Sequence, residues 1–345
     1  MHILIATDAW APQINGVVRT LTRVRDELQV LGHRVTVIAP GDFASIPCPT
    51  YPEIRLALFP GRRMRRLIDA ASPQAIHIAT EGPLGQAARK YCLKRGLRFT
   101  TSFHTRFPEY INARFGIPPG WLYAALRRFH GPSAAVMVAT ESLRQELTGR
   151  GFRHVVPWSR GVDTELFRPR VERPYQVEPP IFLYVGRVAV EKNIEAFLRL
   201  RLPGSKVVVG DGPQLAALRR AHPEVLFTGA KTGEDLARHY AAADVFVFPS
   251  RTDTFGLVLL EALASGLPVA AYPVTGPLDV VNGASVGVLD ENLARAAERA
   301  LTIPRGDCRA FALGYSWRRC AEQFLANLAP YPCRPEALQP QDERP

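Results

Sequence analysis

The sequence has few cysteines and no long hydrophobic run. Its five cysteines, an odd number without a Cys-x-x-Cys pair, predict neither a disulfide framework nor a zinc site. No window approaches the roughly 20 apolar residues that a membrane-spanning helix needs. The first residues, MHILIATD, reach Asp8 without a cationic start or a small-residue cleavage site, so no secretion signal is expected. Together these absences favour a cytoplasmic protein.

Two motifs common in nucleotide-dependent enzymes are also missing. No Gly-x-Gly-x-x-Gly follows the first predicted strand, which argues against a dinucleotide-binding dehydrogenase. No Asp-x-Asp occurs in the chain, so basic residues and helix dipoles would have to stabilise a bound diphosphate. We therefore expect no metal ion and no cofactor.

The excess of positive over negative charge is confined to the first half of the chain. The 345 residues, 47% hydrophobic and 22% charged, suit a soluble protein of two domains. Residues 1–168 carry 23 basic and 12 acidic residues, a balance of +11, whereas residues 169–345 carry 20 of each. Arg-rich coding bias and solvated helix faces explain part of this pattern, but acidic residues are fewer in the first half. The basic half suggests an anionic partner surface, either a membrane or a nucleic acid.

Short apolar strands alternate with amphipathic helices through most of the chain, which predicts parallel sheets covered on both faces. One series begins with a strand at 2–6 and a helix at 17–31, and a second begins with a strand at 181–185. The further strands are predicted at 34–39, 75–78, 98–102 and 134–139, and at 206–209, 225–228, 245–248 and 268–271.

This pattern predicts an α/β fold with two doubly wound domains, whose ligands bind beyond the carboxyl ends of the strands. The second series follows a proline-rich stretch, which is typical of a linker. The last predicted helix has no further strand after it and is expected to cross back to the first domain. The N-terminal domain is predicted at 1–168, the linker at 169–180 and the C-terminal domain at 181–314. This last helix is predicted at 315–330 and a disordered tail at 331–345.

The segment 249–266, PSRTDTFGLVLLEALASG, joins a predicted buried strand to a helix. Near the helix N-terminus, unpaired N–H groups and the helix dipole favour a phosphate. Asp253 precedes the helix and Glu261 lies about two turns along it, so the carboxylates should contact different parts of one elongated ligand. Either could instead be an ordinary surface acid, although a buried-looking helix rarely carries an unpaired Glu. The residues nearest the helix N-terminus are Thr254, Phe255 and Gly256.

Basic residues follow the predicted strand at 181–185. Gly186 and Arg187 end this strand, and Lys192 lies at the start of the next helix, so the two cations can neutralise a diphosphate. The alternative is that Glu191 and Lys192 are plain surface charges of the helix. The strand at 206–209 runs into Gly210, Asp211, Gly212 and Pro213, a tight turn that either contacts the ligand or only connects strand and helix.

Two positions in the N-terminal half are further candidates. Gly16, before the first long helix, would let the backbone approach a phosphate or sugar, although such a glycine is often only a turn. His104 follows the strand at 98–102 in the loop FHTRFPEY and is predicted to face the cleft, with a core or capping role as the alternative.

Two stretches of the N-terminal half combine arginines with apolar residues. They are GRRMRRLI, with Arg62, Arg63, Arg65 and Arg66, and WLYAALRRF, which begins at Trp121. Interfacial membrane helices combine these features, and solvated basic helix faces explain them nearly as well. No nucleic-acid-binding module is visible, so nucleic acid is not expected as a partner.

Taken together, residues 1–330 resemble the retaining glycosyltransferases of GT-B architecture, in the large group containing bacterial α-mannosyltransferases and glucosyl-diacylglycerol synthases. The segment 249–266 is similar to the family's Glu–seven residues–Glu motif, with Asp253 in the first place. The motifs ING, FHT, GR followed by EK, and GDGP also match. The resemblance implies two Rossmann-like domains facing a central cleft, the first binding the acceptor and the second the nucleotide sugar.

The resemblance also implies roles for single residues. Glu261 would bind the ribose hydroxyls, and Asp253, one methylene shorter than the family's Glu, would bind the donor sugar. Arg187 and Lys192 would hold the diphosphate, and His104 would lie beside the reacting sugar and acceptor. The predicted catalytic residues are His104, Arg187, Lys192 and Asp253, and the predicted nucleotide-binding residues are Gly16, Gly186, Gly210, Gly212, Thr254, Phe255, Gly256, Leu257 and Glu261.

The leading hypothesis is transfer of a hexose from a nucleotide diphosphate sugar, with a UDP-sugar favoured, to a lipid such as diacylglycerol. The basic half suggests that the enzyme lies peripherally on the inner face of the cytoplasmic membrane. A GDP-mannose-dependent α-mannosyltransferase acting on a lipid or polysaccharide precursor is the close alternative. A non-catalytic sugar-nucleotide-binding protein and a sugar-nucleotide epimerase remain open as other classes.

Overall fold

The computed structural model describes residues 1–13, 15–48, 51–116, 118–172, 174–253, 255–281 and 283–331. The chain forms two compact units: one holds Met1–Ser102, Arg128–Met137 and residues 325–331, and the other holds Phe103–Arg127 and Val138–Phe324. The domain boundaries, linker and returning helix expected from the sequence stay predictions. Within the described ranges, every helix is too short or too polar to span a lipid bilayer.

The first sheet has six strands in the order β2-β1-β5-β6-β7-β8. β1 pairs in parallel with β2 on one side and with β5 on the other, so the strand order reverses at β1. The strands are β1 (His2–Ala6), β2 (Arg34–Ile38), β5 (Ala75–Ile78), β6 (Thr100–Phe103), β7 (Val136–Val138) and β8 (Val155–Pro157). The intervening elements are α1 (Gly16–Val30), η1 (Pro40–Asp42), the antiparallel pair β3 (Ser45–Cys48) and β4 (Tyr51–Ala57), α2 (Gly61–Ala71), α3 (Pro83–Arg95), α4 (Phe107–Phe115), α5 (Pro119–His130) and α6 (Glu141–Gly149).

A buried carboxylate ties the end of β1 to the start of α3. Asp8 accepts hydrogen bonds from the Leu84 N–H at 2.9 Å and from the Thr80 hydroxyl at 2.7 Å. Gly82 permits this contact, because a Cβ there would lie 2.5 Å from Cγ of Asp8. Burial raises the pKa of Asp8, and the hydrogen bonds oppose that rise. The helix N-terminus beside the strand reversal is thus filled by the protein's own carboxylate.

The second sheet is parallel throughout, in the order β11-β10-β9-β12-β13-β14. Its strands are β9 (Ile181–Val185), β10 (Ser205–Val209), β11 (Leu226–Gly229), β12 (Val245–Phe248), β13 (Val269–Ala271) and β14 (Gly287–Leu289). The helices of this part are η2 (Val190–Lys192), α7 (Ile194–Leu198), α8 (Leu215–Ala221), α9 (Gly233–Ala241), α10 (Leu257–Ala264), α11 (Thr275–Val281), α12 (Leu293–Ala300), α13 (Arg305–Ala312) and α14 (Trp317–Asn327).

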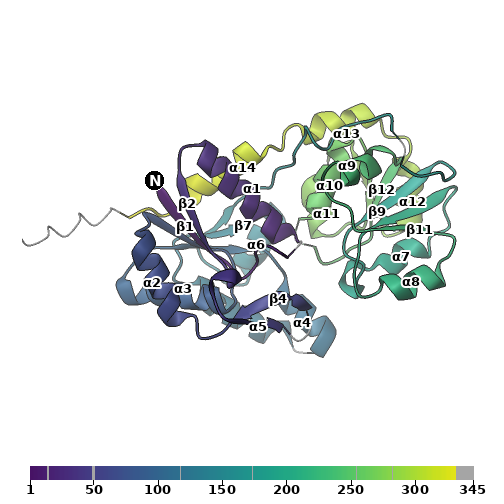
Figure 1. Ribbon diagram of the computed structural model, residues 1–345. Helices are drawn as coiled ribbons and strands as arrows, with labels where there is room; N and C mark the ends of the chain where they lie inside the picture. The colour runs from purple at the N-terminus through teal and green to yellow at the C-terminus, as the bar shows by residue number, and fades with distance from the viewer. Residues whose placement is uncertain are drawn as a thin grey trace, which may run out of the picture. The chain divides into compact units, whose positions relative to one another are not determined.

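Helices cover both faces of this second sheet. Successive side chains of β9 point to opposite sides, so both faces carry apolar groups on which helices can pack. Leu183 and Val185 join a core with α9, α10 and α13. Phe182 and Tyr184 join a separate core with α7, α8 and α12. Figure 1 shows α9 and α10 on one side of β9 and β12, and α7 and α8 on the other. The continuous apolar run of β9 is therefore explained by burial on both faces.

All the predicted strands are present, with ends shifted by at most two residues, and the long helix spans Gly16–Val30. The sequence did not predict β3, β4, β8 and β14. β8 and β14 have only three residues each, none of them fully buried, so they lack the apolar run that marks the other strands. β3 and β4 form a hairpin outside the parallel pattern, and the described positions of β3 are only partly buried or exposed.

Candidate functional site

The strand order of the second sheet reverses between β9 and β12, which lie side by side. In doubly wound sheets, ligands bind beyond the carboxyl ends of the strands at this reversal. Two loops leave the sheet there: residues 186–193 after β9, and residues 249–256 after β12. The predicted residues Arg187, Lys192 and Asp253 lie in these two loops.

Three side-chain contacts join the two loops. The ammonium of Lys192 donates to the carboxylate of Asp253, and both side chains are largely buried, at 25% and 16% exposed. The Asn193 amide donates to the Pro249 carbonyl at 3.0 Å. The Thr252 hydroxyl donates to the Glu191 carbonyl at 3.2 Å. The structure therefore brings together a cation and a carboxylate to which the sequence assigned different parts of the ligand.

Asn193 and Thr252 were not predicted to belong to this site. Asn193 has φ of +53°, in the left-handed region, between η2 and α7. Asparagine tolerates that conformation better than most residues, so an Asn directly after Lys192 was a signal for a turn here. Which strand end the Asn193 amide would contact was not visible in the sequence.

A buried tyrosine fixes the backbone of the loop after β9. The phenol of Tyr184, 2% exposed, donates to the Arg187 carbonyl at 2.7 Å. Burial raises the pKa of Tyr184 well above its usual value, with a further contribution from the charge of Asp253. Gly186 makes room, because a Cβ there would lie 3.0 Å from the Tyr184 hydroxyl and φ is +157°. Tyr184 thus sets the path of the chain that carries Arg187.

Gly210 and Gly212 are explained by close backbone packing. A Cβ at Gly210 would lie 1.9 Å from the Gly186 carbonyl oxygen, and one at Gly212 would lie 2.4 Å from the Val188 oxygen. The Val188 N–H donates to the Asp211 carbonyl at 2.9 Å, so the two loops continue the pairing of β9 and β10. Contact of these glycines with a nucleotide stays a prediction.

The predicted helix after β12 is present as α10, and Gly256 is its N-cap with φ of +82°. Phe255 is buried and Leu257 is the first helical residue. A Cβ at Gly276 would lie 3.0 Å from the Asp253 carbonyl oxygen, so α11 packs closely on this loop. Thr254 lies outside the described residues.

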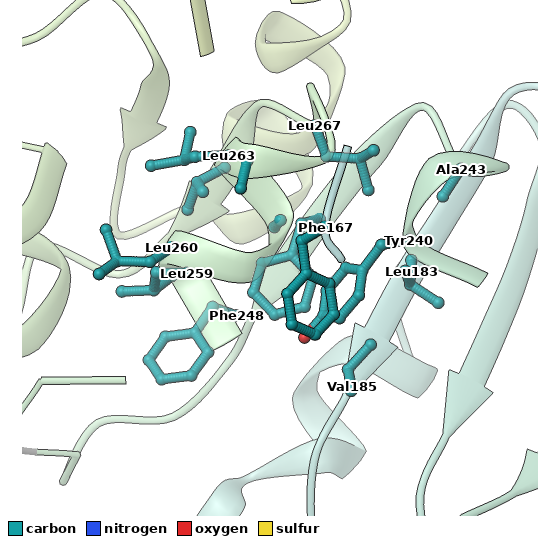
Figure 2. Close-up of a cluster of buried hydrophobic side chains, with 14 of the residues drawn as sticks. Phe167, Leu183, Val185, Tyr240, Ala243, Phe248, Leu259, Leu260, Leu263 and Leu267 are labelled. Carbon is teal, nitrogen blue, oxygen red and sulfur yellow. The ribbon is translucent and has the colours of Figure 1, made fainter. Parts of the chain in front are cut away.

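Glu261 lies on α10 and is buried, at 3% exposed. Its Oε2 accepts a hydrogen bond at 2.9 Å from the phenol of Tyr240, which lies on α9. The Tyr240 ring packs edge-on against Phe167, with 5.6 Å between centroids. Figure 2 shows Tyr240 beside Phe167 among the leucines of α10. Tyr240, which the sequence did not single out, thus fixes the position of one carboxylate oxygen of Glu261.

The two candidates of the N-terminal half lie beside α1 and β6, and their contact with a ligand stays a prediction. Gly16 is exposed and is the first residue of α1, and the preceding Asn15 caps the helix through hydrogen bonds from the Val17 and Val18 N–H groups. His104 directly follows β6. Its Nδ1 lies 3.3 Å from Nη2 of Arg160, a buried cation that was not predicted.

Comparison with known proteins identifies the family. Residues 14–166 match the model of Glycosyltransferase Family 4, and residues 179–312 match that of Glycosyl transferases group 1. A GDP-mannose-dependent alpha-mannosyltransferase of Mycobacterium tuberculosis is 30% identical over 318 residues, 84% of this chain and 83% of that protein. The chain belongs to the glycosyltransferases.

Two further similarities refine this assignment. An alpha-monoglucosyldiacylglycerol synthase of Streptococcus pneumoniae is 26% identical over 79% of this glycosyltransferase and 71% of its own length. The solved structure of a sucrose-phosphate synthase from Thermosynechococcus elongatus superimposes with a TM-score of 0.74 at 20% identity, covering 94% of this chain and 97% of that one. The glycosyltransferase is therefore a hexosyltransferase with the GT-B fold, as the sequence predicted.

Proposed function

We propose that this glycosyltransferase moves mannose from GDP-mannose to a lipid acceptor, with retention of the anomeric configuration. The observation that carries the proposal is the joined pair of loops at the strand reversal, where Lys192 and Asp253 meet. A cation and a carboxylate at the ends of adjacent parallel strands suit a ligand with both an anionic and a hydroxyl-bearing part.

The donor would extend along the carboxyl ends of β9 and β12. Glu261, positioned by Tyr240, would accept hydrogen bonds from the ribose hydroxyls. Arg187 and Lys192 would hold the diphosphate, together with the N–H groups at the start of α10. An ammonium has three donors, so Lys192 can contact Asp253 and a phosphate oxygen at the same time.

The chemical step would need no metal ion. The acceptor hydroxyl oxygen would form a bond to the anomeric carbon on the face from which the diphosphate departs. The bond between that carbon and the phosphate oxygen would break, and this oxygen would take the acceptor's proton. Arg187, Lys192 and the α10 dipole would stabilise the negative charge on the departing diphosphate.

The relatives change our preference between the two donors. The sequence favoured a UDP-sugar, but the GDP-mannose-dependent relative is 30% identical over 84% of the chain. The glucosyldiacylglycerol synthase is 26% identical over 79%. We therefore place GDP-mannose first.

An exposed basic and apolar surface supports a lipid acceptor. Phe59, at 95% exposed, and Leu58, at 40%, precede α2, whose four arginines at positions 62, 63, 65 and 66 are all exposed. Exposed aromatic and aliphatic groups beside cations suit the boundary between anionic headgroups and acyl chains. We propose that this α2 surface brings the enzyme to the cytoplasmic face of a membrane.

The donor is tested first by thermal unfolding with GDP and with UDP, and then by transfer of label from GDP-mannose to extracted membrane lipids. We expect stabilisation by GDP and label in the lipid fraction. Stabilisation by UDP alone would contradict the proposed donor. Label only in water-soluble products would contradict the proposed acceptor.

The α2 surface is tested by binding to anionic phospholipid vesicles. Phe59→Asp should weaken binding, whereas the control Val171→Asp, at an equally exposed apolar residue (97%), should leave it unchanged. Equal vesicle binding by both variants and the wild type would exclude this surface.

Transfer of a glucosyl group from a UDP-sugar to diacylglycerol is the second candidate. The name of the Streptococcus pneumoniae relative favours the glucosyl group and the diacylglycerol acceptor. Both candidates use the same site residues, so the comparison of GDP with UDP separates them.

A further inference from the structure

We propose that Arg160 is a positioning residue that holds His104 as a neutral imidazole with its proton on Nε2. The consequence for catalysis rests on the proposed function, in which His104 lies beside the reacting sugar. The tautomer itself follows from the contacts of the two side chains.

The hydrogen bond between these side chains has one possible direction. A guanidinium has five N–H donors and no acceptor. Nη2 of Arg160 lies 3.3 Å from Nδ1 of His104, so Nδ1 has to accept the hydrogen bond. A nitrogen that accepts carries no proton, and the proton of the neutral ring is therefore on Nε2. Burial lowers the pKa of Arg160 to about 10, which leaves the guanidinium charged at neutral pH.

Arg160 is held in place independently of His104. Its Nη1 donates to the Trp158 carbonyl at 2.6 Å and to the Ser159 carbonyl at 3.1 Å. The guanidinium carbon lies 4.4 Å from the centroid of the Trp158 ring, against which the His104 ring also packs at 5.6 Å. The fully buried indole of Trp158 is fixed in turn, because its N–H donates to the Cys320 carbonyl of α14 at 3.2 Å. A rigid donor of this kind selects one tautomer of the ring next to it.

The position of the charge argues for a role beyond packing. Arg160 is 4% exposed, and within the described part of the chain no carboxylate forms an ion pair with it. A buried cation without a carboxylate is costly, and a neutral side chain could fill the same space. The charge is instead placed against an imidazole nitrogen, where it disfavours a second proton on the ring.

Other titratable groups lie on the neighbouring elements. The Cys320 thiol of α14 donates to the Ser159 carbonyl at 3.1 Å, on the same loop as Arg160. Arg106, two residues after His104, is paired with Glu146 of α6 at 2.6 Å. The charge of Arg106 is thus balanced by Glu146, whereas Arg160 contacts the ring through Nη2.

This tautomer defines what His104 offers to a substrate. Nε2–H can donate a hydrogen bond to a sugar or acceptor oxygen, but it cannot accept a proton from the acceptor. His104 would then act as a hydrogen-bond donor and not as a general base. That role agrees with a same-face displacement in which the departing phosphate oxygen takes the proton.

The test is ¹⁵N NMR of protein labelled in the histidine rings, from about pH 5 to about pH 8. In the wild type we expect His104 to show an unprotonated Nδ1 and a protonated Nε2 even at the acidic end. A proton on Nδ1, or a fully protonated ring near pH 6, would overturn the proposal without any variant.

Arg160→Met and Arg160→Gln then separate charge from hydrogen bonding. We expect both variants to become protonated at His104 at higher pH than the wild type, and the Gln variant, which keeps an N–H donor, to retain more of the Nε2–H tautomer. His77 is the internal control, since its ring contacts the hydroxyls of Thr100 and Ser102 at 2.9 and 3.1 Å and should not change. An unaltered His104 spectrum in folded Arg160→Met would exclude the positioning role.

Kinetics distinguish this proposal from the proposed function. If His104 contacts the reacting sugar, kcat of the Arg160 variants should gain an acidic limb in its pH profile while KM for the donor changes little. If the spectra are as expected but no mannose is transferred from GDP-mannose, the tautomer is established and only the proposed donor is contradicted.

Discussion

The ammonium of Lys192 donates a hydrogen bond to the carboxylate of Asp253, and this contact joins the loops that follow the neighbouring strands β9 and β12. Neither residue therefore acts as an isolated charge. A diphosphate that approaches Lys192 meets a cation already oriented by Asp253, and a sugar that approaches Asp253 meets a carboxylate whose position depends on Lys192.

Asp253→Asn should lower kcat/KM for sugar transfer by about 10-fold to 100-fold, because a hydrogen bond to a charged group contributes about 1.5–3 kcal/mol. The measurement is the rate of label transfer at limiting donor. Glu141→Gln is the control, since Glu141 forms an exposed ion pair with Arg144 on α6 and its loss should leave kcat/KM unchanged. Equal rates for wild type and Asp253→Asn would remove Asp253 from the site.

Asp253→Glu tests whether this carboxylate selects the donor sugar. The added methylene should bring the carboxylate closer to the sugar and alter the ratio of kcat/KM between GDP-mannose and a UDP-hexose. The two donors are compared with the same acceptor. An unchanged ratio would mean that residue 253 does not select the sugar.

Tyr240→Phe should weaken nucleotide binding, because it leaves a buried oxygen of Glu261 without the phenol donor. We also expect a loss of about 1–3 kcal/mol in the free energy of unfolding. Tyr175→Phe is the matched control, since the Tyr175 phenol is buried and donates to the His239 carbonyl at 2.7 Å. Calorimetric titration with nucleotide should show weaker binding for Tyr240→Phe only; equal affinities would make Tyr240 purely structural.

Gly210→Ala should destabilise the protein, because its Cβ would lie 1.9 Å from the Gly186 carbonyl oxygen and its φ is +155°. Overpacking of this kind costs about 1–3 kcal/mol or more. Gly41→Ala provides the comparison, since a Cβ there meets no atom within 4 Å. Urea unfolding should give a lower midpoint for Gly210→Ala alone, and identical midpoints would contradict the close packing of the loops after β9 and β10.

Removal of divalent metals should leave transfer unchanged, because Arg187, Lys192 and the α10 N-terminus are proposed to stabilise the diphosphate. Activity is measured after dialysis against EDTA and again after addition of Mg²⁺ or Mn²⁺. A large loss that either metal restores would show that the cations of the chain do not suffice.

Much of the fold was predictable because strands and helices differ in the local period of their apolar residues. β9 and β12 were placed to the residue, at Ile181–Val185 and Val245–Phe248. The short strand β14 was missed, since three partly buried residues carry too weak a pattern. Asp253 and Glu261 could be singled out because both are tied to one strand–helix unit.

The sequence by itself determined the two α/β series, the confinement of excess positive charge to the first half, and the strand–helix unit to which each candidate residue belongs. These features depend on residues close together in the chain. The tertiary structure decided which of those residues meet: Lys192 with Asp253, Tyr240 with Glu261, and His104 with Arg160. Such pairs are 61, 21 and 56 residues apart, so the local periodicity of apolar residues cannot predict them. They arise because folding places β9 beside β12, packs α9 against α10, and brings the loop after β8 to the end of β6.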